Sequence, residues 1–210
     1  MKLLPVSASA LAALLLALPT AAHADHVIDD FSVPLPNGDL MVGRNSGNPF
    51  HFDEASQTNL GSSTISGDRD TLIDDESGRA YLNSVSIDYN ELMYSTSSGS
   101  SGVLTLSYGE LLLLNADLAD DWAFAFDIDG NMYGGCHSRP VWLTVTVRSG
   151  HGDDAVTQQY TRKVVRDGQY TISFSNFDEI DFTDVTLLQF EFDASQVSGI
   201  DFALSNLRTI

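Results

Sequence analysis

The sequence contains a single cysteine, Cys136, so no disulfide can form within the chain. Basic side chains are also scarce. Ten Lys and Arg residues stand against 29 Asp and Glu residues, which gives a formal net charge of −19 at pH 7. Such an acidic surface repels phosphate backbones and anionic lipid headgroups, which excludes nucleic acid as a partner and disfavours anionic membranes. The same charge attracts cations such as calcium, although acidic side chains also serve solubility alone.

The only segment that reads as a targeting signal lies at the start of the chain. Lys2 precedes an apolar run over residues 11–18, which is too short to span a bilayer, and Ala22-His23-Ala24 stands directly before Asp25. A basic start, a short apolar region and a small-x-small end are typical of a secretory signal peptide. We therefore expect residues 1–24 to be a signal peptide and residues 25–210 to form the exported domain. This mature chain is expected in the periplasm or outside the cell, without membrane insertion.

After this segment no stretch shows the i, i+3, i+4, i+7 apolar spacing of a helix, whereas period-two alternation recurs. The run Leu111–Leu114 has no polar side and is expected to be a strand buried on both faces. Trp122 and Trp142 each begin an alternating run and are expected in the core. Strands are predicted at 26–33, 81–89, 103–108, 111–114, 122–128, 142–147, 161–165, 170–174, 188–192 and 200–204.

Turn residues separate these runs. Asp167-Gly168, between the runs 161–165 and 170–174, predicts a tight hairpin because both residue types tolerate positive φ. About ten short strands without long helices are typical of an all-β antiparallel sandwich. The sequence therefore predicts one β-sandwich domain over 25–210.

Several short motifs follow one another in an order known from other proteins. They are Val27-Ile-Asp-Asp-Phe31, Gly67-Asp-Arg-Asp70, Tyr170–Phe177, Asp181–Val185 and Asp201–Leu207. Together they resemble exported bacterial jelly-roll domains of the galactose-binding-domain-like type, which include carbohydrate-binding modules and the complex I intermediate-associated protein type. In those domains the turn before the Arg-Asp pair has two glycines, and here Ser66 replaces the first. The resemblance implies a jelly roll, an architecture that hosts sugar binding, protein docking and structural roles alike.

One loop combines an aromatic ring with groups that can hydrogen-bond sugar hydroxyls. Tyr133, His137 and Arg139 lie in the segment before Trp142, and Gly134-Gly135 lets a ligand approach the backbone. We expect these three residues to bind a glycan. The alternative is that Tyr133 is a core aromatic and Arg139 pairs with one of the many acidic residues.

Asp127, Asp129 and Asn131 form a candidate calcium site, because oxygen ligands at a hairpin turn can clamp a hard cation. The spacing is not that of an EF-hand, since Gly130 falls at the fourth position of the loop. The alternative is a plain Asp-Gly turn.

A hydrolase site is the least favoured reading. Glu179-Ile-Asp181 is similar to the start of the catalytic strand of β-glucanases, which are also jelly rolls. In those enzymes a second Glu completes the carboxylate pair, but here the last acid is Asp184, three residues after Asp181 and so on the opposite face of a strand. A solvated loop explains this segment better, and no catalytic residues are assigned.

These observations favour an exported, non-catalytic binding module for glycans, with calcium as a candidate stabilising ion. Its expected partner is a glycan or another component of the envelope or matrix. The alternatives are a structural or protein-interaction component of the envelope or matrix, and a β-glucanase-like hydrolase.

Overall fold

The computed structural model describes residues 25–42, 52–75, 82–131 and 140–210. In these residues the chain forms two antiparallel sheets and no α-helix, only the short 3-10 helices η1 (Gly61–Ser63), η2 (Gly152–Asp154) and η3 (Phe174–Asn176). Sheet 1 contains β1 (Val27–Asp29), β2 (Leu40–Val42), β5 (Asn83–Asp88), β6 (Glu91–Thr96), β8 (Ala123–Asn131), β11 (Gly168–Ser173) and β13 (Asp201–Thr209). Sheet 2 contains β3 (Phe52–Thr58), β4 (Asp68–Asp75), β7 (Gly102–Tyr108), β9 (Val141–Ser149), β10 (Val156–Val164) and β12 (Val185–Asp193).

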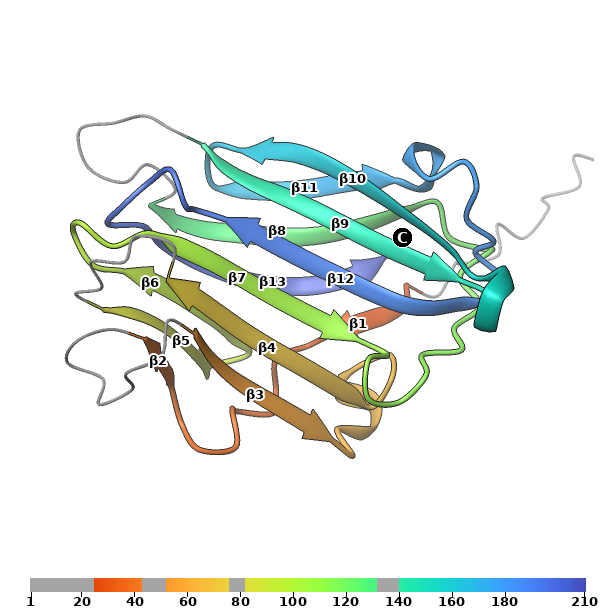
Figure 1. Cartoon of the computed structure of the whole chain (residues 1–210), viewed down its shortest axis with the longest axis horizontal. Helices are drawn as coiled ribbons and strands as arrows, with labels where there is room; N and C mark the ends of the chain where they lie inside the picture. The colour runs from red at the N-terminus through yellow and green to blue at the C-terminus, as the bar shows by residue number, and fades with distance from the viewer. Residues whose placement is uncertain (1–24, 43–51, 76–81, 132–139) are drawn as a thin grey trace, which may run out of the picture.

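The two sheets pack face to face as the layers of a sandwich. Sheet 1 has the strand order β11-β8-β13-β6-β5-β2, with β1 paired to β13, and sheet 2 has the order β10-β9-β12-β7-β4-β3. Figure 1 shows β9, β12, β7, β4 and β3 side by side in one layer, with β8, β13, β6 and β5 in the other. The fold is an antiparallel jelly-roll β-sandwich, as the sequence predicts. No helix in the described residues is long and apolar enough to cross a membrane.

Alternation along each strand builds the core between the layers. In β9 Val141, Leu143, Val145 and Val147 are fully buried, while the residues between them point away from the core. The ring of Phe124 on β8 is central to an aromatic cluster at one end of the sandwich. Its neighbours are Phe174, Phe177, Phe182 and Phe190, with centroids 4.8–6.4 Å away. This interlayer packing is the main stabilising contribution in a chain without internal disulfides.

Three expectations about apolar residues were wrong. Leu111, Leu112 and Leu113 lie in an exposed loop after β7, not in a buried strand. Trp122 is 59% exposed and Trp142 is 37% exposed. Apolar character alone does not determine burial, because a strand of a sandwich has one outer face and the loops have no covering layer.

The hairpin predicted at Asp167-Gly168 was also wrong. β10 pairs with β9 in sheet 2, whereas β11 pairs with β8 in sheet 1. The turn over residues 165–167 therefore carries the chain from the edge of one sheet to the edge of the other. A turn sequence predicts a reversal of direction, but it does not determine whether the flanking strands hydrogen-bond to each other.

A fully buried ion pair lies inside the sandwich. The Nη1 atom of Arg69 on β4 contacts both carboxylate oxygens of Asp29 on β1, at 3.1 and 2.9 Å. Both side chains have no exposed surface. The pair joins two of the motifs on which the family resemblance rests, Val27–Phe31 and Gly67–Asp70. Gly67 precedes β4 at φ +74°, a conformation that side chains disfavour, so this glycine rather than the missing one is needed for the turn.

Most of the remaining polar atoms of this pair are also bonded, and the exception is Arg69 Nε, which is buried without a hydrogen-bond partner among the described residues. Arg69 Nη2 donates to the Val33 carbonyl at 2.7 Å and to Gln57 Oε1 at 2.6 Å. The hydroxyl of Tyr108 on β7 donates to Asp29 at 2.9 Å, and burial raises the pKa of this tyrosine well above its usual value, so it stays a donor. Strands of both sheets are thus connected through one carboxylate and one guanidinium.

We expect Arg69→Ala to lower the free energy of unfolding by about 3–5 kcal/mol, because it leaves the Asp29 carboxylate buried without its counter-charge. Chemical denaturation measures this loss. Arg208→Ala is the control, since Arg208 pairs with Asp25 at 3.5 Å on the surface and should cost at most about 1 kcal/mol. Equal losses in the two variants would contradict a structural role for the buried pair.

Candidate functional site

The outer face of sheet 2 is lined by polar side chains, because the alternation that directs apolar residues inward directs polar residues outward. On β12 these residues are Gln189, Glu191 and Asp193, and on β9 they include Thr144 and Thr146. The strand register aligns them in rows that cross the sheet. One row consists of Gln159, Thr146, Gln189, Ser107, Asp70 and Ser56.

Hydrogen bonds run along this row. Gln159 Nε2 donates to Thr146 Oγ1 at 3.1 Å, and Gln189 Nε2 donates to Ser107 Oγ at 3.1 Å. The amides are therefore oriented by their neighbours instead of extending freely into solvent. Such oriented amide and hydroxyl groups are suited to recognising the hydroxyls of a ligand.

Two adjoining hollows lie on this face. One of about 390 Å³ is lined by Glu54, Ser56, Asp70, Leu72, Thr105, Ser107, Glu110, Leu111 and Gln189. The other, of about 460 Å³, is lined by Leu72, Asp74, Val103, Thr105, Glu191, Asp193 and Ser195. Leu72 and Thr105 belong to both, so the two hollows form one polar depression over β4, β7 and β12, which we term the groove.

Asp68 positions one wall of the groove, because it binds the backbone of the loop after β7. Its carboxylate accepts hydrogen bonds from the backbone N–H groups of Gly109, Leu111 and Leu112, at 3.1–3.2 Å. This fully buried carboxylate therefore determines where Glu110 and Leu111 stand beside the hollow.

Asp70 is the most unusual side chain of the groove. It lines the first hollow but is only 8% exposed, and neither of its carboxylate oxygens accepts a hydrogen bond of normal geometry from a described residue. Burial raises the pKa of Asp70, the nearby Ser56 hydroxyl opposes this shift, and the charges of Glu110, Asp68 and Glu54 add to it. A carboxylate kept dry and unbonded is costly, which is expected at a site that awaits a ligand donor.

Aromatic rings stand at both ends of a second row across the sheet. The register aligns Trp142, Asp193, Val103, Asp74 and Phe52, one residue from each of five neighbouring strands. Trp142 is 37% exposed and Phe52 is 50% exposed. At about 4.8 Å between strands, the row is about 19 Å long, which is the scale of an oligosaccharide and not of a single sugar.

The groove is strongly negative. Six carboxylates line its two hollows, namely Glu54, Asp70, Asp74, Glu110, Glu191 and Asp193. Burial raises the pKa of Glu191, and the neighbouring charge of Asp193 raises it further. These acceptors favour ligands that bring hydroxyl donors or cations, and they repel ligands that bring negative charge.

The predicted glycan-binding residues Tyr133, His137 and Arg139 lie outside the described residues, as does Cys136. Their role stays a prediction. The groove was not part of the sequence-based assignment, although two signals for it were present. The alternation in Leu188–Phe192 identifies Gln189 and Glu191 as outward-facing, and the Gly67–Asp70 motif contains Asp70.

The predicted calcium ligands lie on β8 in sheet 1. Asp127 and Asp129 are on its outer face, and Asp127 Oδ2 accepts a hydrogen bond from Asn206 Nδ2 at 2.7 Å. Asn131 ends the same strand, but its side chain lies outside the described part of the structure. No group of three His, Cys, Asp or Glu side chains in the described residues is arranged to hold a metal ion. Calcium binding here stays a prediction.

The segment compared with β-glucanases forms turns between η3 and β12 and not a strand. The carboxylate of Asp181 accepts bonds from the backbone and hydroxyl of Thr183, at 2.9 and 2.7 Å, and these bonds lower its pKa. Asp184 lies 3.3 Å from His151. The segment therefore does not form the strand that aligns the catalytic carboxylates of those enzymes, and the expected solvated loop is confirmed.

No family model matches the sequence. No curated protein matches it either. Among solved structures, a CBM4 domain is similar at 12% identity and a TM-score of 0.39, over 86% of this chain and 95% of that one. A family 29 carbohydrate-binding module complexed with mannohexaose is similar at 13% identity and a TM-score of 0.35, over 81% and 89% of the two chains.

An exo-β-agarase is similar at 12% identity and a TM-score of 0.43, over 88% of this chain but only 24% of the agarase. This chain therefore spans about a quarter of that enzyme. At TM-scores below 0.5 none of these likenesses determines a ligand for this protein.

We expect Asp70→Asn to stabilise the protein at pH 7 by about 1 kcal/mol, because it removes an unbonded buried charge. The sign follows from the raised pKa: folding favours the protonated carboxyl, so stability falls as pH rises through that pKa. The extra stability of the Asp70→Asn variant should therefore be present at pH 7 and vanish as the pH falls to the ordinary aspartate pKa of 3.8. Thermal unfolding across this range measures it.

Asp120→Asn is the control, since Asp120 is an exposed carboxylate. It should leave the melting temperature unchanged at both pH values. An Asp70→Asn variant less stable than the native protein at pH 7 would show that the carboxylate is structurally bonded.

Proposed function

We propose that this protein is an exported, non-catalytic module that binds a glycan in the groove of sheet 2. The observation that carries the proposal is Asp70, a nearly buried carboxylate that lines the groove and accepts no hydrogen bond of normal geometry from a described residue. A sugar hydroxyl is a neutral donor that can satisfy such a carboxylate without adding charge to the site. The groove thus lacks a hydrogen-bond donor for Asp70, and a carbohydrate hydroxyl would provide one.

The other groups of the groove fit the same ligand. Gln189 can accept from a hydroxyl through its carbonyl oxygen while its nitrogen remains bonded to Ser107. Thr105 and Ser107 add hydroxyls that donate or accept. Paired donors and acceptors at fixed spacing distinguish one sugar stereochemistry from another, since a misplaced hydroxyl leaves a buried group unbonded.

Trp142 and Phe52 provide the apolar surfaces at the two ends of the groove. Sugar rings expose C–H faces that pack on aromatic rings, and this packing offsets the cost of removing the hydroxyls from water. A chain of sugars that spans the row from Trp142 to Phe52 would pass over Asp193 and Asp74. The expected ligand is therefore a neutral oligosaccharide segment.

Export by the signal peptide at residues 1–24 would place this site in the periplasm or outside the cell. Glycans of an envelope or matrix are then the accessible ligands. Calcium at Asp127, Asp129 and Asn131 would act as a stabilising ion on the other sheet, apart from the groove.

A glycan array screens the native protein, and calorimetry then measures the affinity for any ligand found. We expect Trp142→Ala to weaken binding about tenfold, because it removes one stacking surface. Asp70→Asn should also weaken binding, although it stabilises the fold. Trp122→Ala is the matched control: Trp122 is more exposed than Trp142 but directly precedes β8 of sheet 1 and does not belong to the aromatic row of sheet 2, so affinity should not change.

Two results would contradict the proposal. Equal affinity losses in Trp142→Ala and Trp122→Ala would place the ligand elsewhere. A protein that binds no glycan, with or without calcium, would favour the structural or protein-interaction role. Release of reducing sugar that Glu179→Gln abolishes would instead establish the β-glucanase-like activity.

A further inference from the structure

The few cations of this protein are unevenly placed. The described residues include only six Lys and Arg side chains, and three of them, Arg162, Lys163 and Arg166, fall within five positions at the end of β10. Of the others, Arg69 is buried against Asp29. The end of β10 is therefore a concentrated positive surface on a chain with 29 acidic residues. We term these three side chains the basic cluster.

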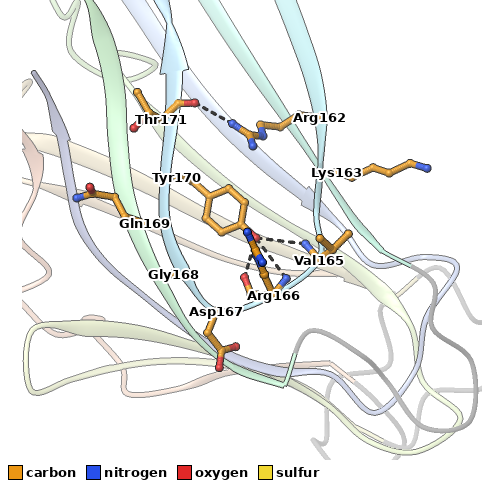
Figure 2. Close-up of a pocket in the computed structure, with 9 residues that line it drawn as sticks. All are labelled: Arg162, Lys163, Val165, Arg166, Asp167, Gly168, Gln169, Tyr170 and Thr171. Carbon is orange, nitrogen blue, oxygen red and sulfur yellow. Dashed lines mark hydrogen bonds between the residues drawn. The ribbon is translucent and has the colours of Figure 1, made fainter.

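The basic cluster lines a hollow of about 840 Å³ at the edge of the sandwich. Its lining residues are Arg162, Lys163, Val165, Arg166, Asp167, Gly168, Gln169, Tyr170 and Thr171. Figure 2 shows that they surround the turn by which the chain passes from β10 in sheet 2 to β11 in sheet 1. The site thus exists because β10 and β11 belong to different sheets.

The shape of the turn is held by Tyr170. Its hydroxyl donates to the Arg166 carbonyl at 2.6 Å and accepts from the backbone N–H groups of Val165 and Arg166, both at 3.3 Å (Figure 2). Its ring stacks on Phe126, with 5.6 Å between centroids and 8° between planes. The backbone that carries Arg166 is therefore anchored to the core.

Arg162 is oriented as well. Its Nη1 atom donates to the Thr171 carbonyl at 2.8 Å, and its guanidinium lies 5.1 Å from the centre of the Tyr170 ring. A guanidinium fixed by one bond and one ring face loses little further entropy when its remaining N–H groups bind an oxyanion. Arg162 is therefore a preorganised hydrogen-bond donor and not a freely moving surface side chain.

No acidic side chain of the described residues neutralises the basic cluster. Within the described ranges, none of the three cations forms an ion pair, and Asp167 is the only carboxylate that lines the hollow. On a surface with so many carboxylates, three neighbouring cations without an ion pair indicate a site for an external anion.

We propose that the hollow at the β10–β11 turn binds an acidic group carried by the glycan, a carboxylate or a sulfate ester. The inference rests on the proposed glycan binding, and it adds a second subsite with the opposite charge preference. Arg162 and Arg166 bind the oxyanion through paired N–H groups. Carboxylates and sulfates share this chemistry, since each presents two coplanar oxygens to a guanidinium.

Lys163 connects this subsite to the groove. Its Nζ atom lies 4.9 Å from the centre of the Trp142 ring, at the end of the aromatic row of sheet 2. A glycan whose neutral sugars occupy the acidic groove can thus place a charged sugar beyond Trp142, where the cations stand. The ligand class is an acidic polysaccharide with neutral stretches, because a uniformly charged chain would be repelled by the groove.

The test compares charged polymers with their uncharged counterparts. Affinity for partly methyl-esterified polygalacturonate, its fully methyl-esterified form, sparsely sulfated dextran and dextran is measured by calorimetry at low and high salt, so that each charged polymer keeps neutral stretches. We expect the native protein to prefer the charged member of one pair, and the preference to weaken at high salt. The pair in which it occurs distinguishes a carboxylate from a sulfate.

Arg166→Gln is the main variant, because Arg166 is exposed and no side-chain bond of it stabilises the fold. We expect it to weaken binding of the charged polymer about fivefold. Arg162→Gln should act in the same direction. Arg208→Gln removes the same charge from a side chain that does not line the hollow and that pairs with Asp25, and it should leave the affinity unchanged.

The inference and the proposed function fail in different ways. If Arg166→Gln and Arg208→Gln lose affinity equally, or if no charged polymer is preferred, the anionic subsite is overturned, while neutral glycan binding that depends on Trp142 still stands. If Arg166→Gln abolishes the preference but Trp142→Ala changes nothing, the subsite stands and the groove proposal is overturned. If no polymer and no glycan binds, both are overturned.

Discussion

The buried pair between Asp29 and Arg69 is the interaction on which the remaining structure depends. It places a positive and a negative charge where no water reaches, and Gln57, Tyr108 and the backbone offset the cost by bonding to Arg69 Nη2 and to the Asp29 carboxylate. The pair ties β1 of sheet 1 to β4 of sheet 2. In a chain without an internal disulfide, this polar contact connects the two layers beside their apolar packing.

Three consecutive residues of β4, Asp68, Arg69 and Asp70, couple the fold to the candidate site. Because side chains alternate along a strand, Arg69 points into the core while Asp68 and Asp70 point to the outer face of sheet 2. Asp68 binds the loop that forms one wall of the groove, and Asp70 stands in the groove and accepts no hydrogen bond of normal geometry from a described residue. The ion pair of Arg69 stabilises the strand on which the costly carboxylate of Asp70 stands. Neighbouring residues of β4 thus serve stability and binding separately.

Positive and negative side chains occupy separate regions of the surface, which the net charge alone does not reveal. The groove of sheet 2 is lined by six carboxylates, whereas the basic cluster occupies the edge at the β10–β11 turn. Lys163 over Trp142 marks the border between the two regions. A ligand that satisfies both must carry hydroxyls along one part and negative charge on another.

Period-two alternation in the sequence determined the fold class and most of the central strands, because these depend on local pattern. The runs at 103–108, 142–147 and 188–192 lie in β7, β9 and β12. The pattern could not show which outer face is hollowed, that Leu111–Leu113 and both tryptophans are exposed, or that the strands flanking Asp167-Gly168 belong to different sheets. Those properties depend on partners far away in the chain, and only the tertiary structure decided them: it brought Asp70, Gln189 and Trp142 to one face because strands remote in sequence pair side by side.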